Sequence, residues 1–218
     1  MTAPDPHSAA LTLAQWLSPA FPIGAFSYSH GLDYLASTGV VDDADSFLEW
    51  ARQILQHGAG RNDTLLLAAA YRAGSDAALA EIDALAAALA ASRERGVELE
   101  DQGRAFVDTV NAVWRLDLPP LTYPVAVGAT AARCDLPIDL TARMYLHALA
   151  TSITSAAMRL APIGQIAGQS CILVLRSICD DVCAQALASD LDALGSSVFL
   201  GDIASMAHET QYSRMFRT

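Results

Sequence analysis

Hydrophobic positions recur at helical spacing along most of the chain. The clearest example lies near residue 50, where Phe47, Trp50, Ile54 and Leu55 follow one another at i, i+3, i+7 and i+8. This spacing puts the four side chains on one face of a helix. The tetrapeptide Ser-Phe-Leu-Glu at 46–49 fits a capping box, so the helix is expected to begin there. A second set with a helical spacing comprises Leu79, Ile82, Leu85 and Leu89.

Proline and glycine residues divide this pattern into about nine or ten helices. Pro19 ends the first helix, Gly58 and Gly60 end the third, and Pro162 opens the last long one. No fixed-period repeat and no linker rich in proline or serine interrupts the chain, which predicts a single all-α domain, a helical bundle over residues 1–218. The expected helices cover residues 9–17, 29–37, 46 to the break at Gly58, 63–71, 76–91, 92–116, 123–134, 138–160 and 162–188.

Composition favours the same fold class. Alanine, the best helix former, is the commonest residue, and aromatic residues make up only 7% of the chain. Residues 121–180 are nearly neutral and rich in small side chains, so we expect them to form the buried centre of the bundle. The four cysteines form no CxxC pair, which is typical of a reducing compartment and indicates the cytoplasm.

Several classes of function are excluded by the charged residues. All 13 basic residues are arginines, so a Walker A loop and a pyridoxal enzyme both lack their lysine. A net charge of −11 argues against nucleic acid as a partner. The uncharged stretch from Pro6 to Leu32 is long enough to raise the question of a membrane span, but Pro19, Pro22 and Gly24 interrupt it, so no membrane contact is expected.

Two groups of residues offer candidate chemistry, and each has a simpler interpretation. Cys179 and Cys183 are one helical turn apart and could hold a soft metal, but two ligands do not make a site and buried cysteine is commonly a small core residue. Ser27 and His30 suggest a nucleophile and base, yet the G-x-S-x-G elbow is absent. His147 lies in an apolar helix and is interpreted as a core histidine. We therefore expect no catalytic, metal or cofactor site.

Two other segments look like interaction elements. Residues 19–28 are apolar and yet built from helix breakers, so they need a surface that covers them. Residues 202–217 carry Ile203 and Met206, then Tyr212, Met215 and Phe216, among polar residues. This pattern fits either a last helix docked on the bundle or a mobile segment that folds onto a partner.

Four segments resemble the UreF family of urease accessory proteins. They read LSPAFPIGAFSYSHGLD at 17–33, YPVAVG at 123–128, YLHAL through RLAPIGQ at 145–165, and DIASMAHETQYSRMF at 202–216. They occur in the family's order, and the first and last are specific. One departure is Ala207, because the family generally has a basic residue before His-Glu-Thr.

The resemblance implies an all-α homodimer that works as a non-enzymatic adaptor. Its partners would be UreD, also called UreH, the nickel-carrying GTPase UreG, and apo-urease. Two alternatives stay open, a nickel metallochaperone using Cys179 and Cys183 and a hydrolase using Ser27 and His30. The residues expected to bind partners are Pro22, Gly24, Phe26, Ser27, Tyr28, His208, Glu209, Thr210, Tyr212, Arg214 and Phe216.

Overall fold

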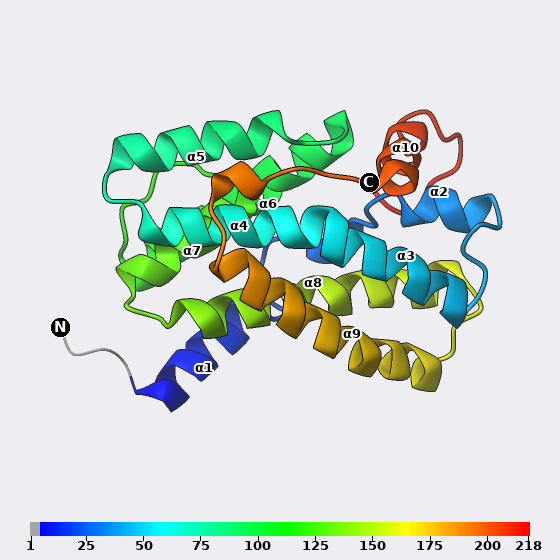
Figure 1. The fold of residues 1–218 in the computed structure, drawn as a ribbon, viewed down its shortest axis with the longest axis horizontal. Coiled ribbons are helices and arrows are strands. Elements are labelled where there is room, and N and C mark those ends of the chain that lie inside the picture. The colour runs from blue at the N-terminus through cyan, green and yellow to red at the C-terminus, as the bar shows by residue number, and fades with distance from the viewer. Residues whose placement is uncertain (1–4) are drawn as a thin grey trace.

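The computed structural model describes residues 5–218 as an assembly of helices, and no strand occurs among them (Figure 1). The all-α prediction is therefore confirmed. The α-helices are α1 (Pro6–Trp16), α2 (Leu32–Ser37), α3 (Ala44–His57), α4 (Ala59–Arg72), α5 (Asp76–Ala88), α6 (Arg93–Trp114), α7 (Tyr123–Arg133), α8 (Ile138–Leu160), α9 (Gln165–Leu187) and α10 (Phe199–His208), with 3-10 helices η1 (Ala25–Ser27) and η2 (Leu191–Ala193).

Helix α7 forms the centre of the bundle, as expected for the start of the neutral block 121–180, but the prediction is wrong for residues 164–180, which are mostly exposed. Every residue from Pro124 to Ala131 is buried, and α4 packs along the helix. Gly128 permits this contact, because a Cβ atom at that position would lie 2.2 Å from the Leu67 carbonyl oxygen. Helices α5 and α6 lie on one side of α4, and α8 and α9 lie on the other (Figure 1).

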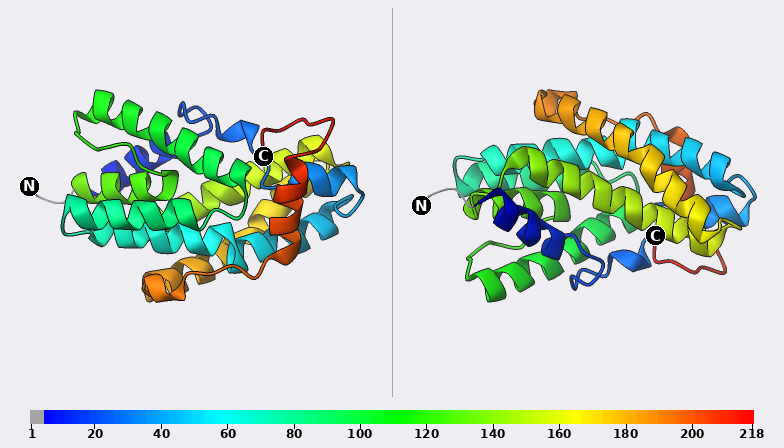
Figure 2. Two further views of the ribbon diagram at one scale, coloured as in Figure 1. Left: turned by 90° about the horizontal axis from the view of Figure 1, so that it is seen from above. Right: turned by 90° about the horizontal axis from the view of Figure 1, so that it is seen from below.

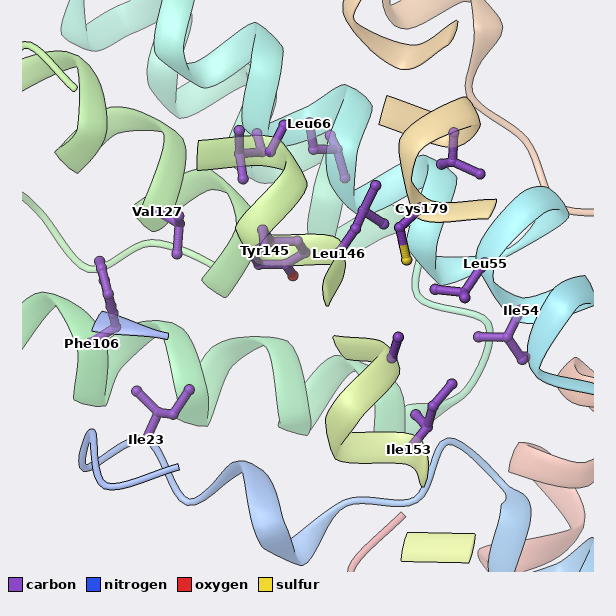
Figure 3. Close-up of a cluster of buried hydrophobic side chains, with 14 of the residues drawn as sticks. Ile23, Ile54, Leu55, Leu66, Phe106, Val127, Tyr145, Leu146, Ile153 and Cys179 are labelled. Carbon is purple, nitrogen blue, oxygen red and sulfur yellow. The ribbon is translucent and has the colours of Figure 1, made fainter. Parts of the chain in front are cut away.

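A continuous core links these layers. Phe106 of α6 packs edge-on against Trp16 of α1 and Tyr123 of α7, with ring centroids 5.7 and 5.8 Å apart. Tyr145 of α8 continues the series at 5.5 Å from Tyr123. Figure 3 shows a second part of the same cluster, where Leu55, Leu146 and Cys179 come together from α3, α8 and α9.

Three predicted helix boundaries are wrong because local caps were misassigned. Asp43, not Ser46, caps α3: the Asp43 carboxylate accepts from the Ser46 amide at 2.8 Å, and the Ser46 hydroxyl accepts from the Asp43 amide at 3.1 Å. Pro162 lies in the loop before α9, whose N-cap is Gly164. Gly60 lies inside α4, so Gly58 alone separates α3 from α4.

The predicted helix at 29–37 is also shorter than expected. His30 and Gly31 adopt left-handed backbone conformations, with φ of 56° and 81°, so α2 begins only at Leu32. A Cβ atom on Gly31 would lie 2.7 Å from the Ser205 amide nitrogen, so glycine also permits α10 to approach. This turn brings the beginning of the chain against its end.

Helix α10 lies across one end of the bundle, beside α2 and the start of α6 (Figures 1 and 2). The C-terminus returns toward the same place (Figure 2). The N-terminal and C-terminal parts of the chain are therefore neighbours in space. Of the helices within residues 5–218, none is apolar enough over sufficient length to cross a bilayer.

Candidate functional site

The two most specific sequence segments, near opposite ends of the chain, meet in the structure. We call residues 17–31 the N-terminal loop and residues 199–218 the C-terminal segment. The Ser29 amide donates to the Thr218 carbonyl at 2.9 Å, and the Arg217 amide donates to the Ser27 carbonyl at 2.7 Å. The Ser29 hydroxyl also donates to Thr218. The sequence placed both segments among the candidate sites, and the structure joins them into one surface.

Asp33, at the start of α2, binds residues 211–216 near the end of the C-terminal segment. Its Oδ2 atom accepts from the backbone amides of Met215 and Phe216 at 2.7 and 3.0 Å. Its Oδ1 atom accepts from Gln211 at 3.3 Å. Because the carboxylate is buried, these donors take the place of water around its charge.

Glu94, in the first turn of α6, provides the second attachment. Its Oε2 atom lies 2.6 Å from Nδ1 of the fully buried His208, and its Oε1 atom accepts from Arg214 at 2.6 Å. Nε2 of His208 faces Asp33 Oδ2 at 3.6 Å. His208 therefore lies between the two carboxylates that hold the segment.

The beginning of α6 makes two further contacts with α10. The Glu209 carboxylate accepts from the Arg93 amide at 2.9 Å, which satisfies one of the free donors at the helix N-terminus. The hydroxyl groups of Ser92 and Ser205 lie 2.6 Å apart. Together these contacts fix the direction of α10 relative to α6.

Arg159 of α8 connects the N-terminal loop to the C-terminal segment. Its guanidinium donates to the Phe26 carbonyl at 3.1 Å and lies 4.5 Å from the centre of the Phe216 ring. The Phe216 side chain is buried whereas Arg159 is exposed on α8, so this cation–π contact lies at the boundary with solvent. Phe216 thus anchors the segment rather than facing outward.

The predicted partner-binding residues fall into two groups. Those that face solvent are available to a partner, whereas the buried ones hold the surface in place. The exposed residues are Pro22, Phe26, Thr210, Tyr212 and Arg214; the buried ones are Tyr28, His208 and Phe216; and Gly24, Ser27 and Glu209 are partly buried.

An exposed apolar stripe on α10 extends this surface. It consists of Phe199, Leu200, Ile203 and Met206, which are between 48% and 75% exposed and follow helical spacing. The sequence analysis missed Phe199 and Leu200 because it began the segment at residue 202. Extending the periodicity by one turn toward the N-terminus would have found them. Tyr212 and Met215 add exposed apolar area beyond the helix.

The alternative metal site is not supported by the environment of its cysteines. Cys179 and Cys183 are buried in the core. Burial raises the pKa of Cys179 to about 12 and that of Cys183 to about 11, which keeps both thiols protonated at neutral pH. A thiol must lose its proton to bind a metal. Within residues 5–218, no three His, Cys, Asp or Glu side chains form a possible metal site.

The alternative hydrolase site also lacks the required geometry. His30 turns its Nε2 atom toward Glu98 Oε1, 3.4 Å away. In the part of the chain that the structure describes, no hydrogen bond joins His30 to Ser27. The interpretation of His147 as a core histidine is wrong, because its side chain is exposed on α8. The buried apolar residues near His147 lie on the other face of α8.

Comparison with known proteins identifies the family. The sequence model of the UreF family matches residues 41–176. The urease accessory protein UreF of Ruegeria pomeroyi is 50% identical over 208 residues, which cover 95% of this chain and 96% of that protein. The UreF proteins of Roseobacter denitrificans and Cereibacter sphaeroides strain KD131 are each 47% identical and cover 96% and 97% of this chain, and 94% and 99% of their own lengths. The chain belongs to the UreF family of urease accessory proteins.

Proposed function

We propose that this chain is a non-enzymatic adaptor that joins UreD, also called UreH, to the GTPase UreG during nickel insertion into apo-urease. Family membership supports a role in urease maturation. The observation that carries the adaptor role is the exposed apolar stripe of α10, together with Tyr212 and Met215. Neighbouring exposed apolar side chains of this kind are typical of a protein–protein interface.

The surface combines outward side chains that can meet a partner with buried contacts that attach its backbone to the bundle. Its outward side chains include Phe26 and Tyr212, and aromatic residues commonly dominate binding energy. The buried contacts of Asp33 and Glu94 hold the backbone beneath them. We infer that UreD binds this surface, because the resemblance implies UreD as a partner and the C-terminal segment carries exposed apolar and aromatic side chains of the kind that dominate interfaces.

Substitution of one stripe residue tests this assignment. Ile203→Asp places a charge in the centre of the stripe and should weaken UreD binding by about thirtyfold, the effect of losing a typical hot spot of about 2 kcal/mol. Phe26→Ala should weaken the same complex. Val113→Asp is the matched control, since Val113 is equally exposed but lies at the other end of α6 from the contact with α10.

Both binding variants should keep the circular dichroism spectrum of the wild-type protein, because their side chains face solvent. Isothermal titration calorimetry with purified UreD gives the affinities. Equal affinities for Ile203→Asp, Phe26→Ala and Val113→Asp would contradict the assignment of UreD to this surface.

We also infer that the adaptor is a homodimer that works in the cytoplasm. The outer face of α9 exposes Ile166, Leu173 and Val174 within a stretch that carries no charge from Leu160 to Leu175. Few charges and exposed aliphatic side chains are typical of the centre of a homodimer interface. Four free cysteines fit a reducing compartment.

A further inference from the structure

His208 is fully buried at the end of α10, with one carboxylate near each nitrogen atom of its ring. Nδ1 lies 2.6 Å from Glu94 Oε2 of α6, and Nε2 lies 3.6 Å from Asp33 Oδ2 of α2. Nδ1 therefore carries a proton, because an ionised carboxylate only accepts hydrogen bonds. Nε2 is buried and has no hydrogen-bond partner within residues 5–218. Without a proton of its own, Nε2 would turn its lone pair toward the negative charge of Asp33.

The charges around His208 balance when both ring nitrogen atoms are protonated. Within residues 5–218, the ion pairs of Asp33 and Glu94 involve only two cationic side chains, His208 and Arg214. Arg214 donates to Glu94 Oε1 at 2.6 Å and so compensates one of the two carboxylates. A neutral imidazole leaves the other carboxylate unpaired, whereas an imidazolium ion pairs it. Buried charges are tolerated chiefly when they are paired and hydrogen-bonded.

The other charged side chains packed near this contact are engaged elsewhere. Glu98, one turn further along α6, pairs with Arg95 at 3.0 Å and faces His30. Glu209 accepts from the first backbone amide of α6. Arg159 of α8 donates to a carbonyl of the N-terminal loop. The charge balance at His208 therefore depends on its own proton.

We propose that His208 is a pH-dependent link between the C-terminal segment and the bundle. Protonation of Nε2 adds a charged hydrogen bond to Asp33, and deprotonation removes it. Histidine ordinarily changes its charge between about pH 5 and 8. His208 meets both carboxylates only while the segment is docked, so docking and proton binding favour each other. The added stabilisation of the docked segment is therefore present at low pH and is lost as the pH rises.

Hydrogen exchange of the free protein at about pH 6.5 and about pH 8.5, on either side of the range in which histidine usually loses its charge, tests this link. The rates are first corrected for the intrinsic effect of pH on amide exchange. Protection factors of residues 209–216 should then fall about tenfold between the two conditions, the effect of losing one hydrogen bond to a charged group. His30 does not contribute to this change, because burial lowers its pKa and keeps the imidazole uncharged at both values.

His208→Asn should abolish the pH dependence, because the asparagine amide can donate to Glu94 but does not titrate. His147→Asn is the matched control, since His147 is exposed on α8, and it should keep the pH dependence of the wild type. Asp33→Asn leaves His208 in place and removes the charged acceptor, so it should also lose the dependence. If His208→Asn does not fold, Asp33→Asn and the wild type decide the question.

Nitrogen-15 NMR of the His208 ring in the wild type observes the proton directly. Both ring nitrogen atoms should be protonated at the lower pH and only Nδ1 at the higher pH. A single protonated nitrogen at the lower pH would overturn the proposal. Equal protection factors of the wild type in the two conditions, or an undiminished pH dependence in His208→Asn, would overturn it as well.

The consequence for UreD rests on the proposed function. The docked segment presents the stripe of α10, so UreD should bind the wild type more weakly at the higher pH, whereas its affinity for His208→Asn should change less. Failure of UreD to bind in either condition would contradict only the proposed function, because the hydrogen exchange and the NMR spectra are measured on the free protein.

Discussion

At the scale of single residues, Asp33 shows how one carboxylate joins distant parts of the chain. It belongs to α2, yet it accepts two backbone amides and one side-chain amide from residues 211–216. The sequence analysis quoted Asp33 only as the last residue of a motif. Its role could not be predicted, because it depends on contacts with residues that lie nearly two hundred positions later in the chain.

Asp33→Asn should therefore destabilise the protein. The amide keeps the shape of the side chain but loses the charge and one acceptor oxygen, which should lower the free energy of unfolding by about 1–3 kcal/mol. Guanidinium denaturation measures this quantity. Asp108→Asn is the control, because Asp108 is exposed on α6, and it should change stability by less than about 0.5 kcal/mol. Equal stability of the two variants would show that the contacts of Asp33 contribute nothing.

For other residues of the site, too, the sequence predicted some features and missed others. His208 and Phe216 were selected from the C-terminal motif, but the sequence could not show that both are buried. Glu94 and Arg159 were missed, because an ionisable residue on a helix looks like ordinary solvent-facing surface until its partner is known. The exposed position of Phe26, by contrast, agrees with the expectation for an apolar loop residue that awaits a partner.

At the scale of helices, the hydrophobic periodicity predicts which segments are helical better than it predicts the residues at which each helix begins and ends. The predicted face of Phe47, Trp50, Ile54 and Leu55 is buried, and α8 has the predicted bounds. The ends depend on local hydrogen bonds and backbone conformations, such as the Asp43 cap and the left-handed His30. Each of those features depends on contacts between a few atoms, so the hydrophobic pattern does not predict it.

The C-terminal segment is predicted to be mobile in the free protein. The kind of contact that holds it supports this prediction. Phe216 is its one large apolar side chain buried in the core, whereas the stripe on α10 and Tyr212 face solvent. Segments held mainly by polar contacts open at a low free-energy cost. Amides of residues 202–217 should therefore exchange faster than those of α7 in the free protein.

Hydrogen exchange monitored by mass spectrometry checks this in the free protein and in the complex. UreD binding should protect residues 202–217 while leaving α7 unchanged, because α7 is buried in both states. Protection of the segment equal to that of α7 without UreD would show that it is simply the last packed helix of the bundle.

At the scale of the whole molecule, the outer face of α9 should decide self-association. Leu173→Asp places a charge in the proposed interface, so the variant should sediment as a monomer where the wild type sediments as a dimer. Leu11→Asp is the matched control, because Leu11 is similarly exposed but belongs to α1. Sedimentation velocity at tens of micromolar protein measures both. A monomeric wild type, or a dimeric Leu173→Asp variant, would contradict the proposed interface.

The most direct test of the adaptor role is whether UreG and UreD associate through this chain. Tagged UreG should retain UreD on an affinity resin when the chain is present and should retain little without it. Nickel-dependent activation of apo-urease should follow the same dependence. Retention of UreD by UreG to the same extent with and without the chain would contradict the adaptor role.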